Sequence, residues 1–160
     1  MTRISHVFLA IGLAFVMSLS VGQAWAQQAA PKQELATNAD DQDQVVATAK
    51  TVLGLIKDGK FNTVWNTHIS AFFKKNLNQD VFVGNLSQGR VNAGLMQSSR
   101  LVDVTYSAKD ILSGYVGNIY TVRFLNKYEH QTSFDYVILI READGQWRVS
   151  AMGGAPAPND

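Results

Sequence analysis

The sequence contains no cysteine. This absence excludes disulfides, a cysteine nucleophile, thiolate metal sites and a lipid anchor attached through a cysteine. Histidine is also scarce, and only His68 and His130 lie beyond the first 26 residues. A metal site needs several converging ligands, and neither histidine has a partner at the spacing that places two ligands on one helix face. The sequence therefore predicts no metal site and no cofactor.

The chain also lacks an excess of charge of one sign. It has 14 lysines and arginines against 13 acidic residues, and Arg3 is the only charged residue of these kinds among the first 26. Without that segment the two signs balance. A nucleic-acid-binding surface needs cations that neutralise phosphates. The sequence therefore predicts no nucleic-acid partner and no tight binding to anionic lipid.

The first 26 residues are typical of a secretory signal peptide. Arg3 precedes an apolar run over residues 7–16, and small residues follow up to Ala24-Trp25-Ala26. The apolar run is shorter than the roughly 20 residues of a membrane-spanning helix. We expect cleavage after Ala26, a periplasmic or secreted protein, and no membrane span after cleavage.

The remaining residues are enough for one domain. Residues 27–44 are rich in Gln, Ala, Asn and Asp, which predicts a flexible lead-in. The Gly- and Pro-containing residues 153–160 predict a flexible tail. We expect a single folded domain over residues 45–152.

Apolar spacing predicts helices in the first half of this domain. Residues 45–56 carry apolar side chains at helical intervals, and residues 61–73 form a second, aromatic stripe with a break at Ser70. Asn78 and Asp80 indicate the start of a third helix, over residues 78–92. Residues 101–106 then read as the first strand.

The second half alternates as strands do. Tyr120, Val122 and Phe124 fall on one strand face. The next strand carries apolar residues on both faces, and we assign Phe134, Tyr136, Ile138 and Ile140 to the inner one, with Asp135 and Arg141 outside. Helices followed by strands favour an α+β fold. We expect N-terminal helices packed on a curved four-stranded antiparallel sheet, as in an NTF2-like cone.

Turn chemistry predicts the strand pairing. Asp144-Gly145 suits a two-residue hairpin loop, which would pair Ile140 with Val149. A three-residue loop at residues 128–130 would pair Phe124 with Phe134 and keep their faces matched, whereas a one-residue shift would reverse the faces. We expect the three-residue loop.

Several short motifs resemble a known family in their order and spacing. They are Asp58-Gly59-Lys60-Phe61, Trp65, Arg90, Gly94, Ser99-Arg100, Gly117, Tyr120, Phe124 and Asp144-Gly145-Gln146-Trp147-Arg148-Val149. Together they resemble the bacterial secreted family called domain of unknown function four-zero-one-nine. The resemblance implies an NTF2-like or cystatin-like fold and an extracytoplasmic location, and it implies no reaction. This chain departs from the family pattern at Ala151-Met152-Gly153-Gly154, where an aromatic pair is usual.

Candidate site residues follow from these faces. His68 is the candidate general base, assisted by Asp135 or Asp103, although a packed histidine fits the pattern too. The aromatic residues Trp65, Tyr120, Phe124 and Tyr136 are candidates to line a ligand pocket, and the alternative is that they form the core. The arginines Arg123, Arg141 and Arg148, with Asp135 among them, form either an anion or partner face or a set of exposed ion pairs.

Three functions fit these observations. The first is a non-catalytic binding or interaction module for a small apolar ligand or an envelope protein. The second is an isomerase or hydrolase with His68 as base, although the sequence contains no nucleophile elbow. The third is a structural component of an envelope complex, and a homodimer is compatible with all three.

Overall fold

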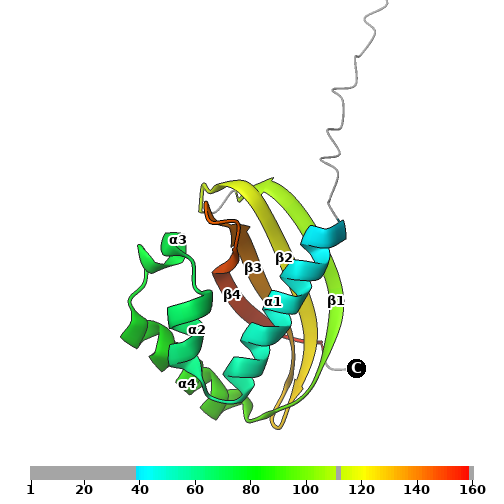
Figure 1. Cartoon of the computed structure of the whole chain (residues 1–160). Coiled ribbons are helices and arrows are strands. Elements are labelled where there is room, and N and C mark those ends of the chain that lie inside the picture. The colour runs from blue at the N-terminus through cyan, green and yellow to red at the C-terminus, as the bar shows by residue number, and fades with distance from the viewer. Residues whose placement is uncertain (1–38, 111–112, 159–160) are drawn as a thin grey trace, which may run out of the picture. The chain divides into compact units, whose positions relative to one another are not determined.

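The computed structural model describes residues 39–110 and 113–158, so the predicted signal peptide lies outside the described residues. Four helices precede four strands (Figure 1): α1 (Ala39–Lys57), α2 (Phe61–His68), α3 (Ala71–Lys74), α4 (Gln79–Ala93), β1 (Met96–Lys109), β2 (Val116–Tyr128), β3 (Thr132–Arg141) and β4 (Trp147–Pro156). Within the described ranges, no helix combines the length and the apolar character needed to cross a bilayer.

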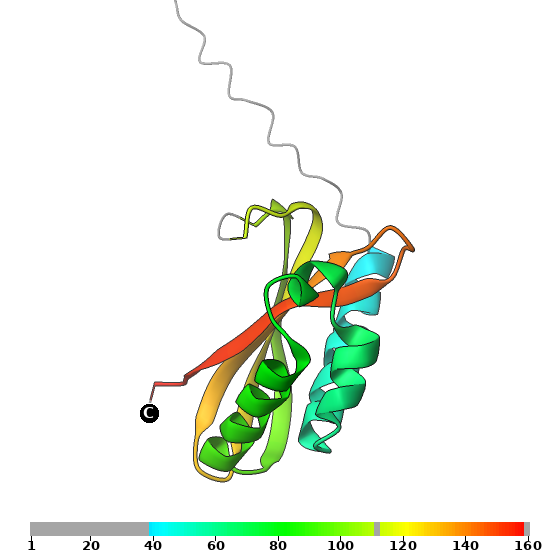
Figure 2. The same ribbon diagram turned by 90° about the vertical axis from the view of Figure 1, so that its left-hand side faces the viewer.

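The strands form one antiparallel sheet in the order β1-β2-β3-β4. The sheet is curved, α1 runs diagonally across one face, α2 lies beside α1, and α4 lies beside α2 (Figures 1 and 2). This arrangement confirms the predicted α+β fold with N-terminal helices on a curved four-stranded sheet.

Local sequence explains the helices. The apolar stripe of α1 buries Val45, Ala49, Val52 and Leu53 against the sheet, as its spacing predicts. α1 begins at Ala39, earlier than expected, with Asp40 and Asp41 in the first turn, where the helix dipole favours anions. Ser70 divides the second stripe and caps α3, and the Asn78 side chain accepts a hydrogen bond from the Val81 amide at the start of α4.

The β2–β3 turn corrects the predicted register. The loop has two residues, Glu129 and His130, so Phe124 faces Asp135 rather than Phe134. The inner face of β3 therefore carries Asp135, Val137 and Leu139. The four residues predicted for that face, Phe134, Tyr136, Ile138 and Ile140, alternate onto the outer one. The loop is held from outside the hairpin: the Glu129 and His130 amides donate to the Leu95 and Ala93 carbonyls at 3.1 and 3.0 Å.

The β3–β4 turn also differs by one residue. Three residues form the loop, with Gly145 at φ 79°, and Ile140 pairs with Arg148 instead of Val149. A three-residue loop that ends in a left-handed glycine is a common hairpin form. A bulge between Ile138 and Leu139 restores the predicted pair of Ile138 with Ala151.

β4 continues through Gly153 and Gly154 to Pro156, so part of the predicted flexible tail is strand. Met152, Gly154 and Pro156 pair with the inner residues Val137, Asp135 and Ser133. This extension supplies one wall of the site described next.

Candidate functional site

A cavity of about 290 Å³ lies between the C-terminal half of α1, one face of α4 and the parts of β2, β3 and β4 near the β2–β3 turn. Most of its lining is apolar and includes Leu53, Ile56, Leu86, Ala93, Met96 and Met152. Its polar residues include Tyr128, Ser133 and Asp135 from the sheet. A mostly apolar concave site with a few polar groups is the usual form of a small-molecule site.

The cavity exists because α4 is buried only near its two ends. Phe82 packs on the Trp65 ring, with the ring centroids 5.3 Å apart, and Ala93 is buried in the last turn. Between them Leu86 and Gly89 face the cavity, and a Cβ at Gly89 would meet no atom within 4 Å. The middle of α4 therefore covers open space rather than packed side chains.

Asp135 is the centre of a polar cluster in the cavity wall. Its Oδ2 accepts hydrogen bonds from Tyr128 Oη at 2.5 Å and from Asn126 Nδ2 at 2.7 Å, and its Oδ1 accepts one from Ser133 Oγ at 2.7 Å. None of the ion pairs among the described residues includes Asp135. The carboxylate is thus held by three neutral donors alone.

This cluster is fixed in one hydrogen-bonding arrangement. Burial, and then the hydrogen bond to Asp135, raises the pKa of Tyr128, so its hydroxyl stays protonated and remains a donor. Asn126 is fully buried, and its Oδ1 has no partner in the described part of the chain. Three donors occupy three of the roughly four acceptor positions of a carboxylate. Asp135 can therefore accept one further hydrogen bond.

Gly154 makes room for this carboxylate. It pairs with Asp135, and a Cβ on Gly154 would overlap Oδ1 of Asp135. On the outer face, the Tyr136 hydroxyl lies 2.7 Å from the position of a Cβ on Gly153. Each glycine therefore lies beside the side chain of a β3 residue, one on each face of the sheet.

Replacing Gly154 with alanine is expected to lower the free energy of unfolding by about 1–3 kcal/mol, the usual cost of overpacking. The added methyl group pushes the Asp135 carboxylate away from its three donors. Gly153→Ala is the matched control, because it displaces only the end of the exposed Tyr136 side chain. Urea denaturation measures both changes, and an equal or larger loss in Gly153→Ala would contradict the assignment.

The family described as Protein of unknown function (DUF4019) matches residues 48–152. The match covers more than half of the chain, from within α1 to Met152 in β4. The chain belongs to the DUF4019 family. No curated protein and no solved structure matches it.

In this DUF4019 protein, residues that carry the resemblance hold the framework. Arg90 donates to the Lys57 carbonyl at 2.9 Å at the end of α1, and its guanidinium lies against Gly59, which has φ 73°. Trp147 packs edge-on against Tyr120, with the ring centroids 5.3 Å apart. Both contacts join segments that are distant in sequence, so they connect elements of the fold: α4 with the end of α1, and β4 with β2.

The four aromatic residues predicted to line a pocket lie in two different places in the structure. Trp65, Tyr120 and Phe124 are at most 8% exposed and belong to the core, and Phe124 also lines a second hollow between α1 and β1. None of the three lines the cavity beneath α4. Tyr136 contributes to the lining although it is on the outer sheet face.

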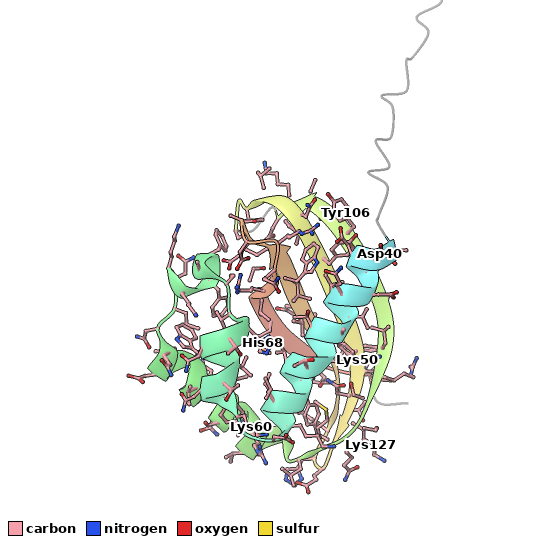
Figure 3. All side chains as sticks on the ribbon, viewed as in Figure 1. Asp40, Lys50, Lys60, His68, Tyr106 and Lys127 are labelled. Carbon is pink, nitrogen blue, oxygen red and sulfur yellow. The ribbon has the colours of Figure 1, made fainter. Side chains whose placement is uncertain are left out.

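The predicted catalytic candidates are not brought together. His68 lies at the C-terminal end of α2 (Figure 3), outside the lining of the cavity that contains Asp135. Burial, and then Arg148, lowers the pKa of His68. Asp103 accepts hydrogen bonds from the Arg123 guanidinium, which hold the pKa of Asp103 below its usual value. Of the three candidates, only Asp135 reaches the cavity.

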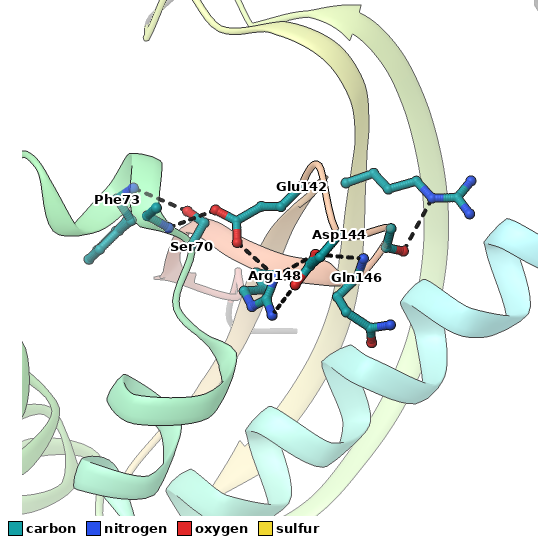
Figure 4. Close-up of polar contacts among 9 residues, drawn as sticks. Ser70, Phe73, Glu142, Asp144, Gln146 and Arg148 are labelled. Atoms are coloured by element: carbon teal, nitrogen blue, oxygen red, sulfur yellow. Dashed lines mark hydrogen bonds and ion pairs between the residues drawn. The ribbon is translucent and has the colours of Figure 1, made fainter.

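The three predicted arginines are in separate ion pairs. Arg123 pairs with Asp103, and Arg141 pairs with Asp41 of α1 at 3.3 Å. Arg148 pairs with Glu142 and Asp144 at the β3–β4 turn (Figure 4), at 2.8 and 2.7 Å. Asp135 is not among them, because its hydrogen bonds go to Asn126, Tyr128 and Ser133 near the β2–β3 turn.

Hydrogen bonds from Arg148, and then from the Gln146 amide, lower the pKa of Asp144 from 3.8 to about 2. Because the folded pKa lies below the unfolded one, ionised Asp144 stabilises the fold above about pH 4, and this contribution is lost as the pH falls towards 2. An NMR titration of the Asp144 carboxyl carbon should give this low midpoint. Arg148→Gln should raise the midpoint towards 3.8, and an unchanged midpoint would contradict the assignment.

The sequence patterns did not identify Asn126, Tyr128 and Ser133 as site residues. Their signal is a run of polar side chains at alternate positions near the β2–β3 turn. That signal is visible only in the two-residue-loop register, in which Asn126, Ser133 and Asp135 share one face.

Proposed function

We propose that this DUF4019 protein is a non-catalytic module that binds a small, mostly apolar ligand in the cavity beneath α4. The observation that supports the proposal is the unfilled cavity between α4 and the sheet. Leu86 and Gly89 face an open volume of about 290 Å³ where a covering helix usually buries its side chains on the sheet. A ligand that fills this space gains roughly 25 cal/mol for each Å² of apolar surface removed from water.

The lining suits such a ligand. Met96 and Met152 have flexible, polarizable side chains that adapt to different shapes. The three donors on Asp135 leave one acceptor position for a ligand hydroxyl, a ligand N–H or a water.

The proposal places this activity in the periplasm or outside the cell, on the evidence of the first 26 residues. Intact-mass measurement of protein from the periplasmic fraction tests the location. A chain that begins at Gln27 is the expected result, and a chain that retains residues 1–26 would contradict it.

Binding is tested with N-phenyl-1-naphthylamine, a neutral apolar probe whose fluorescence rises out of water. Gly89→Leu fills the cavity and should abolish the signal, whereas Gly84→Leu should retain it. The two substitutions are matched, because both glycines lie in α4 with open space around them and only Gly89 lines the cavity. Both should also stabilise the helix, by about 0.5–1 kcal/mol.

Loss of binding in a variant that is more stable than the natural protein cannot be attributed to unfolding. Equal probe binding by the two leucine variants, or no binding by the natural protein, would contradict the proposal. Native mass spectrometry of protein purified from the periplasm provides a second test through any ligand that it retains.

A further inference from the structure

A second hollow of about 250 Å³ lies between α1 and β1. Its apolar residues are Leu53, Met96, Leu101 and Phe124. It shares Leu53, Lys57 and Met96 with the cavity beneath α4. The two spaces are therefore neighbours, and the flexible Met96 side chain lies at their common boundary.

The α1 side of this second hollow is positively charged. Lys50, Gly54 and Lys57 are spaced at i, i+4 and i+7, which places them on one helix face. The lining contains no Asp or Glu. Within the described residues, neither lysine takes part in an ion pair. Figure 3 shows Lys50 on α1.

Gly54 is unexpected at this position. A glycine inside a helix is less favourable than alanine by about 1 kcal/mol, and a close packing contact would give a reason for its presence. Here a Cβ would meet no atom within 4 Å. The glycine leaves open space between the two lysines at the mouth of the hollow.

Charge is distributed unevenly along the two spaces. Lys50 and Lys57 line the α1–β1 hollow, and Lys57 also lines the cavity beneath α4, together with Arg90. The far wall of that cavity carries the Asp135 carboxylate, which takes part in no ion pair among the described residues. An elongated ligand with a negative group is attracted at the lysine end and repelled at the Asp135 end.

We propose that the ligand is a single-chain amphiphile with an anionic head group such as a carboxylate. The head group lies over Gly54 between Lys50 and Lys57, and the hydrocarbon chain passes Leu53 and Met96 into the cavity beneath α4. This inference rests on the proposed function, because the chain occupies that cavity.

The test compares three probes with the same chain and different head groups: dodecanoate, dodecanol and dodecylamine. Each displaces N-phenyl-1-naphthylamine from the mature protein at concentrations below aggregation of the probe. Two exposed lysines should make dodecanoate bind roughly three- to tenfold more tightly than dodecanol. Dodecylamine should bind more weakly than either.

Lys50→Gln combined with Lys57→Gln should remove the advantage of dodecanoate and leave dodecanol binding unchanged. Lys75→Gln combined with Lys109→Gln is the control, because it removes the same charge at exposed lysines outside both linings. Gly54→Leu should weaken dodecanoate while stabilising α1.

The inference is overturned if dodecanoate binds no better than dodecanol, if dodecylamine matches dodecanoate, or if the Lys50 and Lys57 substitutions have no more effect than the control pair. These results are distinguishable from failure of the proposed function. If the proposed function itself fails, dodecanol does not bind either, or its binding is insensitive to Gly89→Leu.

Discussion

Replacing Asp135 with alanine is expected to lower the free energy of unfolding by about 2–4 kcal/mol. The change removes three hydrogen bonds to a charged group, each worth roughly 1.5–3 kcal/mol, although relaxation and water entry recover part of this. It also removes the Asp135 oxygen that accepts a hydrogen bond from Nδ2 of the fully buried Asn126. Urea denaturation followed by tryptophan fluorescence gives the difference.

Tyr128→Phe is the control for Asp135→Ala. It removes one of the three donors and keeps the ring, so about 1 kcal/mol is expected. If the phenylalanine variant loses as much stability as the alanine variant, the carboxylate is not the centre of the cluster. The Tyr128 hydroxyl would then stabilise the fold by another route.

The second large effect is expected at Leu139. This side chain is fully buried on the inner face of β3, and Leu139→Ala should cost about 2–5 kcal/mol through lost burial and the resulting cavity. Ile138 is the matched neighbour, because it is of similar size but half-buried on the outer face. Ile138→Ala should cost less than half as much.

This pair of substitutions tests the β3 register directly. A one-residue shift in pairing exchanges the two faces of a strand. A larger loss at Ile138 than at Leu139 would support the register predicted from the strand faces, in which Asp135 lies on the outer face. The cavity cluster and the arguments built on it would then be wrong.

Local sequence patterns predicted the helices and strands because the periodicity of each element can be read from that element's own residues. The stripe of Val45, Ala49 and Val52 identifies a helix face, and the alternation of Tyr120, Val122 and Phe124 identifies the inner face of β2. Ser70 and Asn78 were identified as boundaries because their side chains bond to amides three residues on. These features confirm the predicted fold class and order of elements.

The register of β3 could not be predicted in this way. Its two faces are both apolar, so alternation does not distinguish Ile138 from Leu139. The choice is made by the Glu129 turn, whose side chain accepts a hydrogen bond from the Leu95 amide at 2.8 Å. That contact joins segments 34 residues apart, and no local pattern contains it.

The sequence by itself determined the absence of thiol chemistry, the order of helices before strands and the inner face of β2, since composition and short-range periodicity are properties of the chain alone. Tertiary structure decided which β3 face meets the helices, and with it the position of Asp135. It also decided that Gly89 faces open space, because an unfilled volume depends on how α4, which is buried at Phe82 and Ala93, packs on the rest of the fold.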